Sequence, residues 1–411
     1  MAADDAARSR ASWKRNKAQA APHGQPPRGD VTRMLSFEVR HPDPGGRARC
    51  GTVTTPHGQI RTPAFMPVGT RATVKGLWPQ QVRDSGTDIL LANTYHLLQR
   101  PGAELVERLG GLHKFMAWDG PILTDSGGYQ VFSLADLNKI TDEGVTFRSH
   151  IDGQTIHMDP LSATRIQNQL GADIIMAFDQ CPPGDADRAT AQAAVDRTIR
   201  WAGRCHSAHQ RSDQALFAIV QGGVYCDLRL ACAQKLIEID FPGYAVGGLS
   251  VGETHEQMVE VLREVVPALP PDRPRYLMGV GMPRDILAAV QVGIDLFDCV
   301  LPTRNGRNGS AFTAGGTLRL RNEKHRLDPG PLEENCPCPA CRQFSRGYIR
   351  HLFLVGEMMG PILVSVHNLW FYQRFMARLR DLIPNGDYAT MLAEFPVAGE
   401  PGRADSRIST G

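Results

Sequence analysis

Three cysteines lie within six residues, in Cys336-Pro-Cys338-Pro-Ala-Cys341. Thiolates at this spacing, completed by one imidazole, suit a tetrahedral zinc ion, and such a set leaves no coordination position open for chemistry. The sequence therefore predicts a structural zinc site. Three incidental buried thiols are the alternative, but a cluster in a proline-rich loop argues against it. On spacing alone, either His351 or His367 can supply the fourth ligand.

Two aspartates stand where a carboxylate needs a partner or a function. Asp298 interrupts the apolar run Leu-Phe-Asp-Cys-Val, and Asp125 opens the turn Asp-Ser-Gly-Gly. Burying a carboxylate in a strand without hydrogen-bond partners costs several kcal/mol. Asp295, on the other face of the same run, is interpreted as a cap. Two carboxylates without a catalytic metal suit chemistry at an acetal carbon, with one as nucleophile and the other as acid and base.

A second set of polar residues has the hydrogen-bonding pattern of a flat heterocycle. Asp179, Gln221 and Gly247-Gly248 each follow an apolar run. A carboxylate, a carboxamide and exposed N–H groups complement the Watson–Crick edge of a purine, and they would reject an analogue that left them unpaired. Tyr129, after the Gly-Gly turn, can stack on such a ring. The alternative is ordinary turn formation, since Asp-Ser before Gly-Gly is common in turns.

Positive charge is concentrated around the cysteine cluster. Residues 300–351 contain nine Lys and Arg against four Asp and Glu, whereas the whole chain has a net charge of only +2. Arg342, Arg346 and Arg350 recur every fourth residue, which predicts a helix over 342–355 with one basic face. Such a face can bind a phosphate backbone; an ordinary solvated helix face is the alternative interpretation.

The elements that position these residues are eight short apolar runs with amphipathic segments, such as 188–210, between them. This pattern predicts parallel strands buried on both faces, and eight units over about 240 residues fit a (β/α)₈ barrel. A doubly wound sheet is the alternative, but the nearest nucleotide fingerprint, Gly279-Val-Gly281, lacks its third glycine. In a barrel, polar residues after each strand meet at the C-terminal rim. The eight runs are 64–68, 88–92, 121–124, 173–178, 216–220, 244–247, 276–280 and 296–300.

The two ends of the chain differ from this pattern. Residues 1–33 are rich in Ala, Arg, Pro and Gly, which predicts a disordered extension, with an organelle transit peptide as the alternative. The folded part is expected over 34–396, with Met34 as an alternative start, and 397–411 as a disordered tail. Nine cysteines without a signal-peptide core favour a reducing cytoplasm, and no apolar run is long enough for a membrane span.

Taken together, the motifs resemble the bacterial-type tRNA-guanine transglycosylases, the queuine tRNA-ribosyltransferase family. The resemblance runs from about Phe37 to Leu392. It implies an irregular (β/α)₈ barrel with a zinc-binding subdomain at 303–370, and one structural Zn²⁺ per subunit held by Cys336, Cys338, Cys341 and His367. The motifs that carry it, besides the cysteine set, are Thr124–Gln130, Phe178-Asp179, Val220–Gly223, Tyr244–Leu249 and Phe297–Arg307.

The resemblance also implies a reaction and roles for individual residues. The wobble guanine of tRNAs with GUN anticodons (Asp, Asn, His, Tyr) would be exchanged for preQ1, a 7-substituted deazaguanine, through a covalent tRNA–enzyme ester. A cytoplasmic homodimer is also implied, with no membrane association. The implied roles are Asp298 as nucleophile, Asp125 as general acid and base, Tyr129 and Met278 stacking on the base, Asp179, Gln221 and Gly248 reading its edge, the Leu249 carbonyl near the 7-substituent, and Arg304 and Arg307 holding phosphates.

Two positions bear on which base is accepted. Cys181 and Val251 resemble the bacterial form, whose base is the small preQ1, whereas relatives that admit the bulkier queuine have glycine at the position of Val251. Gln180 departs from the family pattern, which has glutamate there, and this bears on the preference between guanine and preQ1. Two other functions stay open: a non-catalytic tRNA-binding subunit, against which both Asp125 and Asp298 argue, and a nucleoside hydrolase, against which the basic zinc module argues.

Overall fold

The computed structural model describes residues 35–134, 138–149 and 151–399. The predicted disordered extension at 1–33, the alternative start at Met34 and the tail beyond 399 lie outside the described residues. Among the described helices, none is long and apolar enough to cross a membrane.

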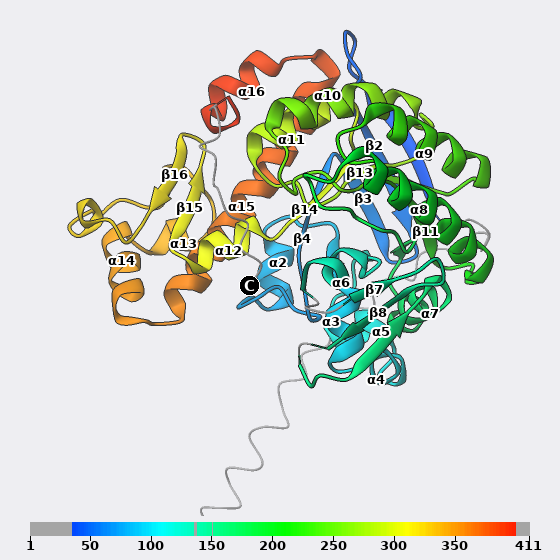
Figure 1. The fold of residues 1–411 in the computed structure, drawn as a ribbon. Helices are drawn as coiled ribbons and strands as arrows, with labels where there is room; N and C mark the ends of the chain where they lie inside the picture. Colours follow the sequence, from blue (N-terminus) through cyan, green and yellow to red (C-terminus); the bar gives the residue numbers. More distant parts are fainter. Residues whose placement is uncertain (1–34, 135–137, 150, 400–411) are drawn as a thin grey trace, which may run out of the picture. The chain divides into compact units, whose positions relative to one another are not determined.

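Eight parallel strands form a barrel (Figure 1). A parallel bridge between Val68 and Leu91 joins the first strand of the sheet to the last. Every residue is buried in seven of the strands, which explains their near-continuous apolar runs. The predicted barrel is confirmed, and the doubly wound sheet is wrong. In spatial order the strands are β4 (Ala64–Pro67), β14 (Leu296–Cys299), β13 (Arg275–Leu277), β12 (Tyr244–Val246), β11 (Ala215–Val220), β10 (Ile174–Met176), β6 (Ile122–Thr124) and β5 (Leu90–Ala92).

Helices follow the strands and cover the barrel. The predicted helix at 188–210 is α8 (Arg188–Ala208), and it begins where the Asp187 side chain accepts the N–H of Thr190 at 2.8 Å. The other helices around the barrel are α2 (Pro79–Asp84), α3 (Thr94–Gln99), α4 (Ala103–Arg108), α5 (Gly111–Phe115), α6 (Gly128–Leu134), α7 (Pro160–Leu170), α9 (Cys226–Ile239), α10 (His255–Val265), α11 (Pro283–Gln291) and α16 (Tyr388–Glu394), with 3₁₀ turns at Val266–Ala268 and Ile383–Asn385.

Two antiparallel sheets are added to the barrel: β1 (Ser36–Pro42), β2 (Arg49–Thr55) and β3 (Gly58–Thr62), and β7 (Asn138–Ile140), β8 (Val145–Arg148) and β9 (Thr155–Met158). The first sheet is anchored by Arg49, whose guanidinium donates to both carboxylate oxygens of Asp295 at 2.9 and 2.6 Å. Asp295 is fully buried and also accepts the Arg275 N–H. It thus lies at the N-terminal end of β14, away from the rim.

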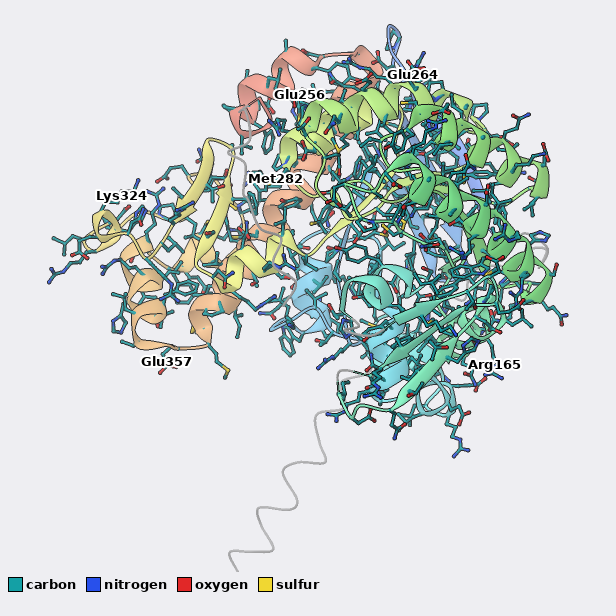
Figure 2. The ribbon with its side chains drawn as sticks, in the orientation of Figure 1. Arg165, Glu256, Glu264, Met282, Lys324 and Glu357 are labelled. Atoms are coloured by element: carbon teal, nitrogen blue, oxygen red, sulfur yellow. The ribbon has the colours of Figure 1, made fainter. Side chains whose placement is uncertain are left out.

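The region predicted to bind zinc has a small core of its own. It contains α12 (Leu301–Arg307), β15 (Ser310–Thr313), β16 (Gly316–Arg319), a 3₁₀ turn at Glu323–His325, α13 (Pro339–Gln343) and α14 (Arg346–Val355). Apolar side chains of this region form a separate cluster that includes Leu320, Ile349 and, from the helix that follows, Val364. These elements project beside the barrel, with Lys324 and Glu357 at their outer edge (Figure 2).

The predicted continuous helix over 342–355 is wrong, and with it the single basic face. The chain breaks between α13 and α14 because the Ser345 side chain caps the second helix by accepting the Tyr348 N–H at 3.1 Å. Arg342 therefore lies on a different helix from the other two arginines. Arg346 pairs with Asp328 and Arg350 with Glu323, so part of the excess charge is neutralised locally.

Helix α15 (Met359–Leu382) connects the zinc region to the barrel. On it, Tyr372 donates to the Gly281 carbonyl at 2.5 Å and Gln373 to the Phe65 carbonyl at 3.1 Å. The described part of the chain closes with a 3₁₀ turn, Pro396–Ala398. The tail predicted from 397 begins too early, because Val397 and Ala398 are buried and the Val397 N–H donates to the Ala314 carbonyl at 2.9 Å.

Candidate active site and metal centre

Asp298 lies at the C-terminal end of β14, on the rim of the barrel. Its Oδ1 accepts two hydrogen bonds, from the Tyr276 hydroxyl at 2.6 Å and from the Gly279 N–H at 2.7 Å. Burial raises the pKa of the carboxyl, and these two donors act in the opposite direction. Among the described residues, none donates to Oδ2, so this oxygen is free to react.

Asp125 follows β6 on the same rim and is more enclosed than Asp298. Its Oδ2 accepts from Asn93 Nδ2 at 2.5 Å and from Gln130 Nε2 at 2.9 Å, and its Oδ1 accepts from the Thr94 N–H at 2.7 Å. Burial raises its pKa to about 6, although the three donors oppose this; the nearby negative charge of Asp298 adds to the increase. A carboxyl with this pKa can give up and take back a proton near neutral pH.

Asp179 and Gln221 lie next to each other in the same rim. Gln221 Nε2 donates to Asp179 Oδ2 at 2.8 Å, and the Ser126 hydroxyl donates to Oδ1 at 2.9 Å. The Gln221 Oε1 is buried and has no partner within the described residues. A buried polar atom without a partner is costly unless a ligand completes it. Asp179 and Gln221, both predicted to face the heterocycle, are thus hydrogen-bonded to each other, and the Gln221 Oε1 is available to a ligand.

Gly248 has the backbone conformation that the sequence motif requires. Its φ is +64°, and a Cβ there would lie 2.4 Å from the Gln221 Oε1. Only glycine meets both conditions at low cost. Neither the Gly248 N–H nor the Leu249 N–H donates to an acceptor in the described part of the chain. Two backbone donors are therefore left open beside the Asp179 and Gln221 pair.

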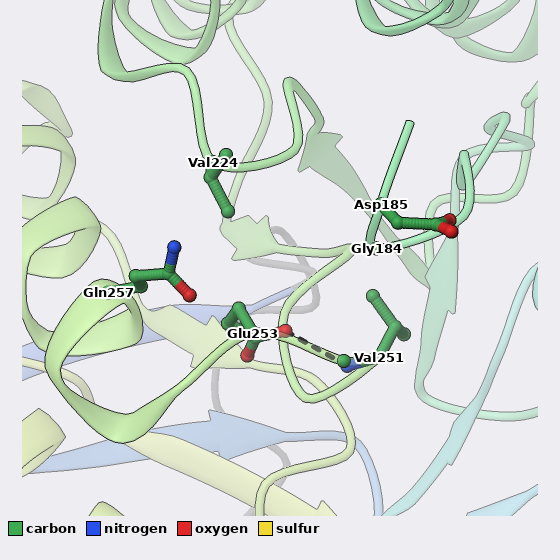
Figure 3. A pocket seen from close by; sticks show the side chains of 7 residues that line it. Gly184, Asp185, Val224, Val251, Glu253 and Gln257 are labelled. Carbon is green, nitrogen blue, oxygen red and sulfur yellow. Dashed lines mark hydrogen bonds between the residues drawn. The ribbon is translucent and has the colours of Figure 1, made fainter. Parts of the chain in front are cut away.

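The segment after Gly248 is held by Glu253, whose carboxylate accepts the N–H groups of Ser250 and Val251. In a trans peptide the carbonyl points opposite to the N–H, so the Leu249 carbonyl is directed away from Glu253. Val251 and Glu253 line a cavity of about 410 Å³ together with Gly184, Asp185, Val224, Gly252 and Gln257 (Figure 3). Space thus opens directly beyond Val251.

Cys181 and Gln180 have different surroundings. Burial raises the pKa of the Cys181 thiol to about 12, so the thiol is neutral, and its effect on which base is accepted stays a prediction. The Gln180 side chain accepts a hydrogen bond from Arg197 on α8, and its N–H donates to the Thr198 hydroxyl at 3.1 Å. Gln180 is therefore tied to this helix, and its effect on base preference stays a prediction.

The residues predicted to stack on the base and to bind phosphates also lie on the rim. Tyr129 lies in the first turn of α6 and is 42% exposed, and Met278 follows β13 and is half-buried. Arg304 and Arg307 lie on α12, and neither pairs with a carboxylate of the described residues. The pKa of Lys75 is lowered, mainly by burial and further by the nearby positive charges of both arginines. An uncompensated group of cations is a site for an anion.

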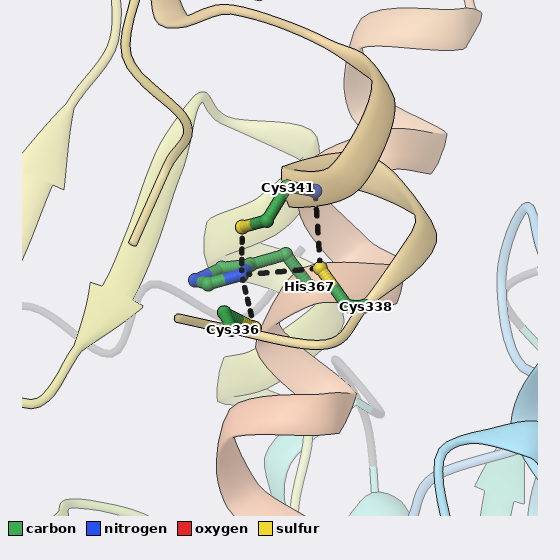
Figure 4. Close-up of side chains that lie close together, drawn as sticks. All are labelled: Cys336, Cys338, Cys341 and His367. Atoms are coloured by element: carbon green, nitrogen blue, oxygen red, sulfur yellow. Dashed lines mark hydrogen bonds between the residues drawn. The ribbon is translucent and has the colours of Figure 1, made fainter. Parts of the chain in front are cut away.

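The four predicted metal ligands converge (Figure 4). The His367 Nδ1 lies 3.6, 3.6 and 3.3 Å from the Sγ atoms of Cys336, Cys338 and Cys341. A tetrahedral zinc site with its usual bond lengths has nitrogen–sulfur separations of about 3.5 Å. The His367 Nε2 lies 2.7 Å from the Phe312 carbonyl, which fixes the tautomer that presents Nδ1 to the thiols. The residues fit a metal ion; His351 is exposed and is not part of the cluster.

A second group of possible metal ligands, two histidines and an aspartate, lies at the start of β10. Asp173 contacts His57 Nδ1 at 2.8 Å and His113 Nε2 at 3.1 Å, and the two imidazoles stack 3.5 Å apart at 15°. A metal binds in the plane of an imidazole ring, so two parallel stacked rings cannot both coordinate one ion well. We interpret this group as a hydrogen-bond network that ties the β2–β3 turn to the barrel.

Comparison with known proteins matches the family model for queuine tRNA-ribosyltransferase to residues 43–398. Three relatives of that name are each 53% identical: those of Symbiobacterium thermophilum (91% of this chain, 94% of the relative), Novosphingobium aromaticivorans (88% and 97%) and Cereibacter sphaeroides (92% and 99%). The chain belongs to the queuine tRNA-ribosyltransferase family. The resemblance drawn from the motifs is confirmed, and the chain is accordingly a pentosyltransferase.

Several residues of this queuine tRNA-ribosyltransferase site were not identified from the sequence alone. Tyr276, which binds the Asp298 carboxylate, appears in the sequence only as part of an apolar run. Its position two residues before Met278 puts both on one face of β13, which is the signal that could have identified it. Asn93 stands after a predicted strand, but nothing in the sequence pairs it with Asp125. Glu253 gives no local signal.

Proposed function

We propose that the protein exchanges the guanine at the wobble position of tRNA for preQ1. The observation that carries this proposal is a pair of carboxylates on the barrel rim in different environments. Beside them lie hydrogen-bonding groups without protein partners that match the edge of a purine. Asp298 has an open oxygen, and Asp125 has a pKa near neutrality. Asp179 and the Gln221 Oε1 offer acceptors and the Gly248 N–H offers a donor, which together complement guanine and its deaza analogue.

The exchange proceeds in two displacements. The Asp298 Oδ2 attacks ribose C1′, the glycosidic bond to guanine breaks, and Asp125 protonates the leaving base. This step forms a tRNA–enzyme ester. The incoming base then loses its proton to Asp125, attacks C1′ and expels the Asp298 carboxylate. The two Asp298 donors, Tyr276 and Gly279, stabilise the carboxylate as it leaves.

We propose that tRNA phosphates bind at Arg304 and Arg307, with Lys75 beside them. These cations face no carboxylate among the described residues, and the Arg307 Nη1 is buried without a partner. Tyr129 and Met278 flank the position of the heterocycle. A ring between them would be stacked on both faces, which fixes its plane relative to Asp179.

A decisive test is the incorporation of labelled preQ1 or guanine into unmodified tRNA with a GUN anticodon. We expect incorporation at the wobble position, with release of one guanine for each preQ1 bound. A non-catalytic tRNA-binding subunit would bind tRNA without incorporation. A nucleoside hydrolase would release guanine and leave an abasic site, with no base inserted.

We propose Zn²⁺ as the ion in the Cys₃His cluster, with a structural role. Replacing Cys338 with serine is expected to lower Tm by about 10 °C, because the lost metal-binding free energy is also folding free energy. The free thiol Cys226 is the matched control, and its serine variant should keep one zinc per chain and the wild-type Tm. Turnover that depends on added metal in fully folded enzyme would contradict the structural role.

We propose that Val251 restricts the pocket to the small preQ1 base. Replacing Val251 with glycine removes its side chain from the cavity boundary, so kcat/KM for queuine should rise at least about tenfold. The kcat/KM for preQ1 should change by less than about threefold, because the Val251 N–H contact to Glu253 remains. Measuring both bases against the same tRNA tests this; an unchanged queuine value would assign the restriction to another residue.

We also propose that the protein acts as a cytoplasmic homodimer. Exposed apolar side chains are grouped at the turn between α14 and α15, where Leu354, Val355 and Met358 are 54%, 56% and 78% exposed. Such a patch favours a protein partner, and a second copy would complete it symmetrically. Nine free cysteines fit a reducing compartment. Mass measurement in solution tests the dimer.

A further inference from the structure

Arg229 is a fully buried cation behind the base pocket. It lies in the first turn of α9, and its side chain returns to the ends of β11 and β12. Nε donates to the Gly223 carbonyl at 2.6 Å, Nη1 to the carbonyls of Val220 and Gly247 at 3.1 and 2.8 Å, and Nη2 to the Gly248 carbonyl at 3.1 Å. Four backbone carbonyls from two adjacent strand ends are therefore held by one guanidinium.

The surroundings of Arg229 are unusual for a buried charge. It makes no ion pair with a carboxylate in the described residues, and burial lowers its pKa to about 10. A buried guanidinium without a counter-ion costs several kcal/mol, so apolar packing alone does not explain it. The Cγ of Arg229 also lies where a side chain on Gly222 would be, since a Cβ there would come within 2.6 Å. The glycine and the arginine thus fit each other.

The carbonyls bound by Arg229 determine where the opposite ends of the same peptides point. In a trans peptide, the C=O and N–H groups are antiparallel. A Gly247 carbonyl directed at Arg229 therefore directs the Gly248 N–H away from it, and the Gly248 carbonyl does the same for the Leu249 N–H. These are the two backbone donors that have no acceptor among the described residues.

We infer that Arg229 is a positioning residue for base recognition: by holding the Gly247 carbonyl, it directs the Gly248 N–H of the same peptide into the pocket as the donor for the base carbonyl. Arg229 does not touch the base itself. A flexible Gly-Gly turn would otherwise sample many orientations, and binding would have to order it. The inference rests on the proposed base exchange and adds to it a residue that determines affinity for the free base.

The test measures KM for guanine and KM for tRNA separately in the exchange assay, with R229K and R229Q. A lysine cannot bridge four carbonyls, because it lacks the planar fork of the guanidinium. We expect the KM for guanine to rise about 10- to 100-fold, with the KM for tRNA within about twofold of wild type. Replacement of a residue with only a structural role would shift neither constant in folded protein.

Arg275 provides the matched control, since it is also a buried arginine that donates to backbone carbonyls, those of Leu269 and Gly293. It begins β13, at the opposite end of the barrel from the rim. R275K should lower Tm and leave the KM for guanine unchanged. An unchanged guanine KM in R229K, or an equal rise in R275K, overturns the inference.

Variants of Arg229 that fail to fold also give a clear result. If both R229K and R229Q unfold at the assay temperature while R275K stays folded, Arg229 is a residue required for folding and the inference is overturned. Wild-type protein that binds tRNA but incorporates no guanine contradicts the proposed function instead. The two failures are therefore distinguishable.

Discussion

Replacing Asp298 with alanine is expected to abolish base exchange, with kcat reduced at least about 10⁴-fold. The carboxylate is the proposed nucleophile: it lies at the end of β14, and its Oδ2 accepts no hydrogen bond from a described residue. Without it, the covalent tRNA–enzyme ester cannot form. Denaturing gel electrophoresis of enzyme mixed with labelled tRNA should show a shifted adduct for wild type and none for Asp298→Ala.

The matched control for this prediction is Asp295→Asn, three residues earlier on the same chain segment. Asp295 is buried in an ion pair with Arg49 at the opposite end of β14. Removing one partner of a buried pair costs about 3–5 kcal/mol, so this variant should melt earlier than wild type. The fraction that stays folded should still form the adduct. An adduct in Asp298→Ala would show that another residue is the nucleophile.

The barrel could be predicted because its signal is local. Seven of the eight strands are short runs in which every residue is buried, and the residues after each strand face the rim by geometry alone. Asp125, Asp179 and Asp298 could therefore be assigned to one site before any contact was known. The metal cluster was predictable for a related reason, since three of its ligands lie within six residues.

What could not be predicted depends on contacts between distant segments. Arg229 looks like any charged residue of an amphipathic helix, and only the fold shows that its side chain turns back to Gly247 and Gly248. The arginine periodicity from 342 to 355 predicted one helix because spacing does not show that the Ser345 hydroxyl caps a new one. Val397 and Ala398 looked like a tail because their burial partner, Ala314, is far away in sequence.

Replacing Asp125 with asparagine is expected to slow the first chemical step about 10³-fold, with the Kd for tRNA within about twofold of wild type. The amide has nearly the same shape and can still accept from Thr94, but it cannot protonate the departing guanine. Single-turnover measurements of guanine release resolve this step. Loss of tRNA binding in this variant would assign Asp125 to RNA recognition instead of proton transfer.

The pKa of Asp125, raised to about 6 by burial, also gives the pH dependence of this step a sign. The first displacement needs Asp125 protonated and Asp298 ionised, so its rate in wild type should fall up to about tenfold per pH unit above about pH 6. At lower pH it should fall again as the Asp298 carboxylate, whose pKa burial raises, takes up a proton. The asparagine variant should lose the fall above about pH 6.

The stability of the protein changes in the same pH window: because the folded-state pKa of Asp125 is higher than the unfolded value, wild type loses stability as pH rises from about 4 to about 6. The free energy of unfolding of Asp125→Asn, relative to wild type, should therefore increase by about 2 kcal/mol between pH 4 and pH 8. A constant difference across that range, measured by urea denaturation, would show that Asp125 titrates at its ordinary pKa and would remove the basis for its role as the acid.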